Sequence, residues 1–292
     1  MDSLWTEYFK GDSFYDFDYV LTRYAHDPLT KIDLQERWID IPVQLDTSRH
    51  VVRVHALGTT ASPEFRIDGD TMDEKQEVLD FVFSLFQWDR NLEKIHQHFL
   101  ETNLEQLFNA HPGTPIVKDF QLYGCLVKTI IHQQLNMKFA YTLGARFIER
   151  YGEEVNGVWF HPQPETVAEI PYEDLRELQF SQRKAEYVID TSRMIAEGQL
   201  DLQELSKKND EEIVDKLVKI RGIGAWTAEN WLLFGLGRED LLPKADIGIQ
   251  NAVKFYLKQK MKPSIQEIAD LSQRWEPYRS YASLTLWRSI EG

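Results

Sequence analysis

The sequence predicts a mainly α-helical protein with an N-terminal β-rich domain, which is an α+β fold class. Residues 37–57 alternate apolar and polar side chains around a turn at Asp46, Thr47 and Ser48, the period-two pattern of paired, half-buried strands. The period changes after Met72, because apolar residues between Val78 and Phe86 recur three and four positions apart. We find no repeat of fixed period, which excludes a solenoid.

The rest of the chain is expected to fold as short helices joined by short loops. Breaks at Pro112, Gly113 and Pro115 precede helices predicted over residues 120–137, 139–151, 164–170, 172–180, 183–197 and 211–220. Asp210 is the expected N-cap of the last of these. We therefore expect an N-terminal β-rich domain over 1–72, a helical domain built from 73–114 and 240–292, and a second helical domain over 115–239.

The composition limits the possible functions. A net charge of −14 with a pI near 5.1 argues against a nucleic-acid partner, because DNA-binding proteins present a basic face. Only a local basic surface could overcome this objection. The single cysteine, Cys125, excludes a disulfide framework and a thiolate-rich metal site, and we expect it to be buried. No segment resembles a signal peptide or a membrane span, so we expect a cytoplasmic protein with no membrane partner.

Residues 217–237 are the most informative segment. A helix predicted to end at Ile220 is followed by a turn over residues 221–224, with Gly222 and Gly224, and then by a second helix. Glycines let a backbone approach a partner closely, and the free N–H groups of a helix N-terminus attract anions. Lys216, Lys219 and Arg221 surround this turn on an otherwise acidic chain. The pattern fits one or two DNA phosphates, although a plain helix–turn–helix with glycine caps would read the same way.

Four blocks in this order resemble the helix-hairpin-helix DNA glycosylase superfamily, and within it 3-methyladenine DNA glycosylase II (AlkA type). They are residues 130–140 (IIHQQLNMKFA), residues 175–198 (LRELQFSQRKAEYVIDTSRMIAEG), the hairpin, and LLPKADIGIQ together with RWEPYRSYASLTLW near the end. The resemblance covers most of the chain from about 115 to 287. It implies the helical bundle of those enzymes, and the β-rich domain matches the extra N-terminal domain of the 3-methyladenine branch.

The resemblance places the essential carboxylate of these enzymes at Asp246. A fixed anion stabilises the oxocarbenium-like sugar that forms when an N-glycosidic bond breaks, and it can orient or deprotonate water. Asp246 could also be a simple N-cap of the following helix, and both roles can hold at once. In bifunctional members of the superfamily a lysine stands at the position of Trp226 and forms a Schiff base. Its absence here implies a monofunctional enzyme that leaves an abasic site.

The resemblance also implies an aromatic base pocket. Trp226 and Trp287 match rings that sandwich a flipped base, with Tyr281 as a plausible neighbour, and Asn230 stands where a third aromatic is often found. Two indole faces favour a cationic purine such as 3-methyladenine or 7-methylguanine, by roughly 0.5–2 kcal/mol. Core packing is the alternative for Trp226, and the polar Asn230 leaves the range of bases open.

The remaining implied residues contact DNA. Gln133 and Gln134, with Leu135 adjacent, fall where the superfamily fills the gap left by the flipped base; a surface or capping glutamine pair is the alternative. The hairpin residues implied in phosphate binding are Lys219, Arg221, Gly222 and Gly224. No cofactor is expected to be required, but the superfamily's hairpin holds a monovalent cation (Na+ or K+) on backbone carbonyls, which would be those of Val218, Ile220 and Ile223.

These observations predict a monomeric hydrolase that flips alkylated purines out of duplex DNA and initiates base excision repair, associated with the nucleoid in a bacterium. Two alternatives stay open. One is a helix-hairpin-helix glycosylase for another damaged base, and the other is a non-catalytic DNA-binding protein that kept the hairpin.

Overall fold

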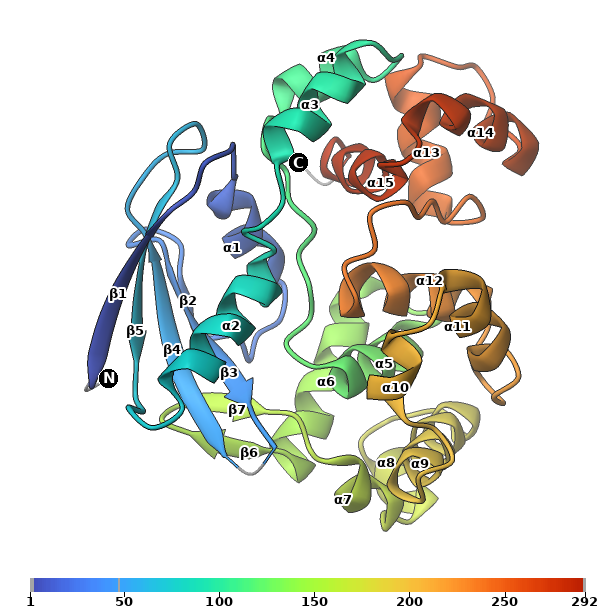
Figure 1. Ribbon diagram of the computed structural model, residues 1–292. Helices are drawn as coiled ribbons and strands as arrows, with labels where there is room; N and C mark the ends of the chain where they lie inside the picture. The colour runs from blue at the N-terminus through green and yellow to red at the C-terminus, as the bar shows by residue number, and fades with distance from the viewer. Residues whose placement is uncertain (1–2, 47, 291–292) are drawn as a thin grey trace.

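A computed structural model describes residues 3–46 and 48–290. The N-terminal part is an antiparallel sheet in the order β1-β5-β4-β3-β2 (Figure 1). Its strands are β1 (Trp5–Lys10), β2 (Ile32–Asp33), β3 (Trp38–Gln44), β4 (Arg49–Ala56) and β5 (Glu64–Gly69). The predicted pairing of residues 37–57 is the β3–β4 hairpin, and of its turn residues only Thr47 lies outside the described part of the chain.

The β-rich region also contains a helix that the periodicity did not predict. Asp16 accepts a hydrogen bond from the Tyr19 backbone N–H at 3.0 Å and so begins α1 (Phe17–Tyr24). The aromatic residues Tyr15, Phe17 and Tyr19 are buried in the core.

Six helices pack with this sheet in one continuous core. They are α2 (Lys75–Phe86), α3 (Leu92–Leu100), α4 (Glu105–Ala110), α13 (Ile247–Tyr256), α14 (Ile265–Leu271) and α15 (Arg279–Arg288). Figure 1 shows α2 along the sheet and α13, α14 and α15 beside α3 and α4, so the C-terminal helices lie against helices from the first half of the chain. Trp275, in the 3-10 turn Ser272–Trp275, is fully buried and donates its indole N–H to Asn103 Oδ1 at 2.8 Å.

A second core organises the middle of the chain. Its helices are α5 (Leu122–His132), α6 (Met137–Tyr151), α7 (Pro164–Ala168), α8 (Tyr172–Glu177), α9 (Gln182–Ala196), α10 (Leu202–Ser206), α11 (Asp210–Leu217) and α12 (Ala225–Asn230), which continues into a π-helical turn, Trp231–Gly235. Cys125 is buried there. The division into three domains stays a prediction. Among the described residues, no helix is both long and apolar enough to cross a membrane.

One local expectation was wrong. The N-cap of α11 is Asn209, not Asp210, because Asn209 and Glu212 form a reciprocal capping box. A small hairpin, β6 (Glu153–Val155) and β7 (Val158–Phe160), which was not predicted, occupies the connection between the helices expected over 139–151 and 164–170. Its turn is Asn156-Gly157, both at positive φ, the strongest short-range hairpin signal. That dipeptide was visible in the sequence.

Lys184 fixes the end of α5, where the chain turns toward the site described below. Its ammonium donates to the carbonyls of Ile130 (3.0 Å), Ile131 (2.8 Å) and Gln133 (3.0 Å). These acceptors lie at a helix C-terminus, where carbonyls lack intrahelical partners, and of the three the Ile130 carbonyl also accepts the Gln133 backbone N–H at 3.4 Å. Burial lowers the pKa of Lys184 to about 8.

Replacing Lys184 with Met should therefore loosen this turn as well as destabilise the fold. Loss of the ammonium leaves buried carbonyls unsatisfied, so we expect the free energy of unfolding to fall by about 1–3 kcal/mol in urea denaturation. Lys94→Met, at an exposed position, is the control and should change stability by less than about 0.5 kcal/mol. Equal midpoints for the two variants would remove Lys184 from this role.

Candidate active site

Asp246 is held by donors from three separate parts of the chain. It is the N-cap of α13, and its Oδ1 accepts from the Ile249 backbone N–H at 3.0 Å. The indole N–H of Trp287 reaches the same oxygen at 3.1 Å, and the indole N–H of Trp226 lies 3.4 Å from Oδ2. The cap and the site are thus the same carboxylate, and both of its oxygens are oriented.

Asp246 lines a cavity of about 410 Å3, within the roughly 300–1,000 Å3 range of small-molecule sites. Trp226, Asn230, Trp287 and Leu135, which the sequence predicted as site residues, also line it. The structure adds a larger set that the sequence did not suggest: Arg23, Tyr24, Val117, Asp119, Lys128, Thr129, His132, Met137, Tyr141, Phe234, Gly248 and Ile290. The N-terminal helix α1 therefore contributes to the site through Arg23 and Tyr24.

One helical face supplies the aromatic wall. Trp226, Asn230 and Phe234 are spaced four residues apart, so they project on one side of α12 and of the π-helical turn that continues it. Asn230 is buried and donates its amide to the Trp226 carbonyl at 2.7 Å. Phe234 stacks on Trp287 with centroids 6.2 Å apart and planes at 26°. The missing aromatic at Asn230 is followed one turn later by Phe234, which the same spacing could have revealed.

Tyr281 does not belong to this wall. It is buried in the core, with 1% of its surface exposed, and its hydroxyl donates to Glu239 at 3.2 Å. Six residues separate it from Trp287, so the two side chains of α15 project toward different surroundings. The expectation that Tyr281 borders the base pocket is corrected.

The cavity also contains a compact polar group. Lys128 forms a hydrogen-bonded ion pair with Asp119. Burial alone would lower the pKa of Lys128, but Asp119 and Tyr141 outweigh it and raise this pKa above its ordinary value. Burial, with a smaller contribution from Lys128, lowers the pKa of His132 to about 3. His132 is therefore a neutral imidazole at pH 7, packed edge-on against Tyr141 at 4.8 Å.

The three residues expected near the gap of a flipped base take different positions. Gln133 turns inward, where its amide donates to the Gly222 carbonyl and to Thr227 Oγ1, both at 2.8 Å. It links this turn to the hairpin instead of facing solvent. Gln134 is exposed at a φ of 57°, at the tip of the turn between α5 and α6, and Leu135 faces the cavity.

The hairpin has the expected order of helix, turn and helix, with distinct roles for its residues. Gly222 has a φ of 92°, and a Cβ there would lie 2.2 Å from the Tyr187 ring, so only glycine fits. Gly224 is the N-cap of α12 in extended conformation, with open space where a side chain would be. Lys219 is exposed, whereas Arg221 is ion-paired with Glu186 and lies 3.7 Å from Asp190.

The carbonyls implied in cation binding belong to Val218, Ile220 and Ile223, in or just before this turn. Of the three residues, Val218 is partly exposed while Ile220 and Ile223 are nearly buried. The Ile220 carbonyl accepts the Ile223 N–H at 3.0 Å, which leaves one of its two lone pairs free. The described residues contain no cluster of His, Cys, Asp and Glu arranged to hold a metal ion.

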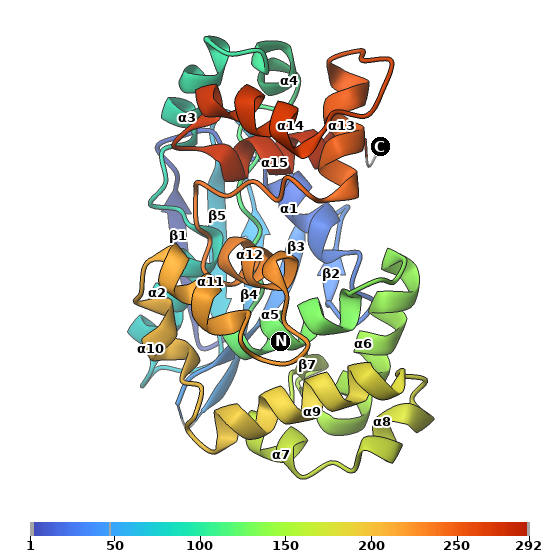
Figure 2. The same ribbon diagram turned by 90° about the vertical axis from the view of Figure 1, so that its right-hand side faces the viewer.

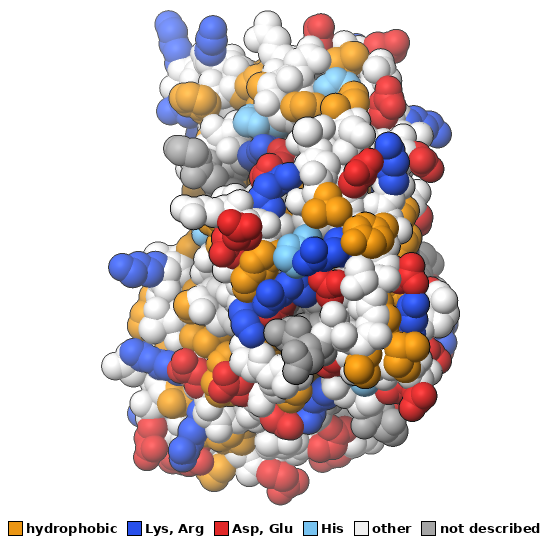
Figure 3. Space-filling view, turned by 90° about the vertical axis from the view of Figure 1, so that its left-hand side faces the viewer, with side chains coloured by type: hydrophobic (Ala, Val, Ile, Leu, Met, Phe, Trp, Pro, Cys, Tyr) orange, Lys and Arg blue, Asp and Glu red, His pale blue; other side chains and the backbone are white. Residues whose placement is uncertain are grey.

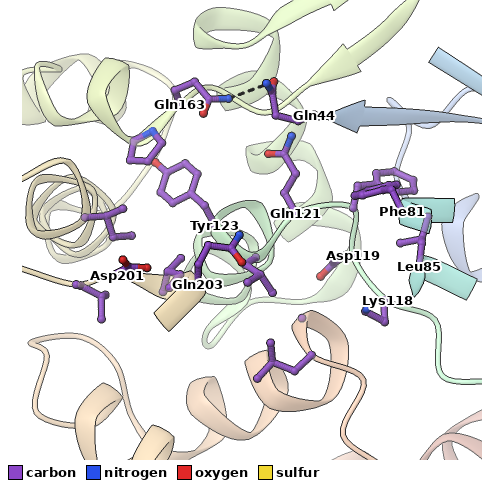
Figure 4. Close-up of a pocket in the computed structure, with 18 of the residues that line it drawn as sticks. Gln44, Phe81, Leu85, Lys118, Asp119, Gln121, Tyr123, Gln163, Asp201 and Gln203 are labelled. Carbon is purple, nitrogen blue, oxygen red and sulfur yellow. Dashed lines mark hydrogen bonds between the residues drawn. The ribbon is translucent and has the colours of Figure 1, made fainter. Parts of the chain in front are cut away.

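A second cavity, of about 690 Å3, has a mostly different lining (Figure 4). Its lining is rich in glutamines, with Gln44 and Gln163 joined at 3.5 Å and Gln121 and Gln203 nearby. Asp119 borders both cavities. The second cavity contains none of the residues predicted from the sequence, so the cavity around Asp246 is the candidate active site.

Residues 127–277 match the HhH-GPD superfamily of base excision DNA repair proteins. The chain belongs to this superfamily. The match includes the second half of α5, the hairpin and Asp246, whereas Arg23, Asp119 and Trp287, which also line the cavity, lie outside it. The fold and superfamily predicted from the sequence are thereby confirmed.

Relatives extend the likeness to the whole chain. The Bacillus subtilis protein named "Putative DNA-3-methyladenine glycosylase YfjP" is 50% identical over 99% of this chain and 100% of its own length. A second B. subtilis protein, named DNA-3-methyladenine glycosylase, is 30% identical over 82% of this chain and 86% of its own. The structure of 3-methyladenine DNA-glycosylase from Archaeoglobus fulgidus shares the fold, with a TM-score of 0.86, 20% identity and 98% coverage of each chain. These findings confirm the expectation of a glycosylase-type hydrolase.

Substitution of Gly248 tests whether the contact between Asp246 and Trp287 matters in this HhH-GPD protein. A Cβ at Gly248 would lie 2.8 Å from Asp246 Oδ1 and 2.9 Å from Trp287 Nε1, so Gly248→Ala should push the indole away from the carboxylate. We expect the single-turnover rate of base release from methylated DNA to fall by about tenfold or more, a loss of roughly 1.4 kcal/mol or more of transition-state stabilisation.

Gly144→Ala is the matched control, because Gly144 also lies in a helix but has nothing within 4 Å of its added Cβ. Alanine is favoured over glycine in helices, so neither variant should unfold the protein. A Gly248→Ala enzyme as active as Gly144→Ala would show that the Trp287–Asp246 contact is dispensable.

Proposed function

We propose that this protein removes alkylated purines of the 3-methyladenine and 7-methylguanine type from duplex DNA. The damaged base is flipped into the cavity, its N-glycosidic bond is hydrolysed, and an abasic site remains. The observation that carries the proposal is the carboxylate of Asp246, oriented by two indole N–H groups at an aromatic cavity.

Asp246 has the properties that this reaction needs. Its partners are neutral N–H donors, and it forms no ion pair with any described residue. Its negative charge therefore remains available to stabilise a sugar that becomes cationic as the bond breaks. The two fixed oxygens can also orient a water molecule for attack on the anomeric carbon.

Hydrolysis is favoured over a lyase reaction because the cavity offers no activated amine. Trp226 occupies the position of the Schiff-base lysine. Lys128 does line the cavity, but its ion pair with Asp119 holds it as an ammonium ion, which is not nucleophilic. Water is thus the nucleophile and an abasic site the product.

The cavity chemistry supports a cationic base. An alkylated purine would meet the negative Asp246 and the faces of Trp226, Phe234 and Trp287. His132 is neutral and Lys128 is already paired, so neither repels a cation as an isolated charge would. The DNA-3-methyladenine glycosylase names of the relatives point to the same substrates.

Duplex DNA is the proposed partner, contacted by a monomer of this chain. Exposed Gln134 would fill the gap in the stack, with Leu135 beneath it. The hairpin, with Lys219 and the glycine turn, would bind a phosphate. The carbonyls of Val218, Ile220 and Ile223 would hold a Na+ or K+ ion there, and such an ion would offset the phosphate's charge.

Asp246→Asn is the decisive variant. Asparagine preserves the size of the side chain and can still cap α13, but it removes the charge. We expect the rate of base release from dimethyl sulfate-treated duplex DNA to fall by roughly 10²–10⁴-fold. Chromatography of the released bases measures this, and binding to the same DNA should persist.

Duplexes with 8-oxoguanine or hypoxanthine, run in parallel, separate the alternatives. Release of oxidised bases alone would replace the proposed substrate class. DNA binding without release of any base would favour the non-catalytic protein. Unchanged release by Asp246→Asn would exclude this carboxylate from the mechanism.

A further inference from the structure

One lysine-rich segment is not part of the cavity or the hairpin. Residues 247–266 contain Lys254, Lys258, Lys260 and Lys262 and no Asp or Glu, in a chain whose net charge is −14. The segment consists of α13 and the loop that follows it. The last three lysines are exposed, and none of the four forms an ion pair with a described residue.

This absence of pairing differs from the arrangement on another basic-looking face. Figure 3 shows Lys and Arg side chains on the outer side of the N-terminal sheet, interleaved with acidic ones. There, Arg53 makes a two-pronged pair with Asp40 at 2.6 and 2.9 Å, and Arg66 pairs with Asp68 at 3.0 Å. Those cations are already neutralised, whereas the lysines after α13 are available to an anionic partner.

The exposed face of α13 leads from the active site to these lysines. Ile247, Asn251 and Phe255 lie on one exposed face of α13, and exposed Lys258 follows the end of the helix at a φ of 52°. Ile247 is next to Asp246, and Phe255 is 71% exposed, unusual for a large apolar side chain with no partner. In Figure 2, α13 stands above α6 on the side that also shows α11 and α12, and its loop reaches the top of the molecule.

We propose that the exposed face of α13 and the lysines at 258, 260 and 262 form a second DNA-backbone contact, on one side of the flipped nucleotide. This inference rests on the proposed function. The ten residues of α13 span about 15 Å, which corresponds to four to five base pairs at 3.4 Å each. When the sugar of the flipped nucleotide lies at Asp246, the phosphates four to five base pairs away on that strand therefore lie near the lysines. Apolar side chains at Ile247 and Phe255 suit the sugars between them.

The surface resolves the conflict between an acidic protein and a DNA partner. The hairpin contributes Lys216 and Lys219, since Arg221 is engaged by Glu186. Lys258, Lys260 and Lys262 follow Asp246 in the sequence, whereas the hairpin precedes it. These three lysines add to the two of the hairpin, so more phosphates can be contacted. Each neutralised phosphate contributes about 0.9 to the slope of log affinity against log salt concentration.

The test compares Lys258→Ala/Lys260→Ala/Lys262→Ala with a triple variant of equal charge, Lys94→Ala/Lys207→Ala/Lys208→Ala, at exposed positions elsewhere. The probe is a 24-base-pair duplex with a central abasic-site analogue, titrated between 50 and 200 mM salt. We expect the first variant to lower the slope by about 2–3 and to weaken binding about tenfold or more at low salt. The second should match the wild type.

Truncated duplexes locate the contact. A duplex that ends three base pairs from the analogue on the contacted side is too short to reach the lysines, so wild type and variant should bind it equally. Truncation on the other side should leave the difference intact. Single-turnover base release with saturating enzyme should stay at the wild-type rate, because the lysines do not touch the reacting base.

Equal slopes for the first variant and the wild type on the full duplex would overturn the proposal and leave an acidic protein as the partner of this surface. Equal losses in both triple variants would also overturn it, because they would reflect net charge alone. Failure of the proposed function is distinguishable. In that case the wild type releases no base, while the binding comparison is still measurable.

Discussion

The candidate active site depends on the hydrogen bonds that two tryptophan indoles and one helix N-terminus donate to the carboxylate of Asp246. Trp226, Asp246 and Trp287 come from three helices and meet at one side chain. Asp246 is partly buried, and removing a carboxylate from water is costly unless it is hydrogen-bonded. Here neutral N–H groups meet that need, so the charge is oriented without being cancelled. The aromatic wall and the Asp246 carboxylate are consequently one hydrogen-bonded unit, and Gly248 is small enough to allow it.

A second set of contacts fixes the position of two turns, the one after α5 and the one in the hairpin. Lys184 donates hydrogen bonds to carbonyls at the C-terminal end of α5, and Gln133 donates hydrogen bonds to Gly222 and Thr227 of the hairpin. The turn that carries Gln134 and the turn that carries Gly222 are therefore positioned against each other by the side chains of Lys184 and Gln133. A site held in this way needs little reorganisation when a substrate binds.

The charge distribution explains how an acidic protein can present an anion-binding side. Basic residues on the sheet are paired with acids, and the Lys128 ammonium in the cavity is paired with Asp119. Lysines of the hairpin and of the segment after α13 form no ion pair with any residue that the structure describes. Net charge describes the whole molecule, but a phosphate responds to charges within about a Debye length, roughly 8–10 Å. Local pairing, not composition, therefore decides which cations remain available to an anion.

The sequence by itself determined the β-rich start, the order of most helices, the hairpin, and the identity of Asp246, Trp226 and Trp287. These are local or motif-level properties: alternation, helical spacing, glycine turns and the order of blocks. Tertiary structure alone decided that Tyr281 is in the core, that Gln133 points inward, that Arg221 is already paired, and that Arg23, Asp119, Lys128 and His132 share the cavity. Those facts depend on contacts between residues far apart in the chain, and no periodicity within one segment records which distant side chain will occupy the other side of a contact.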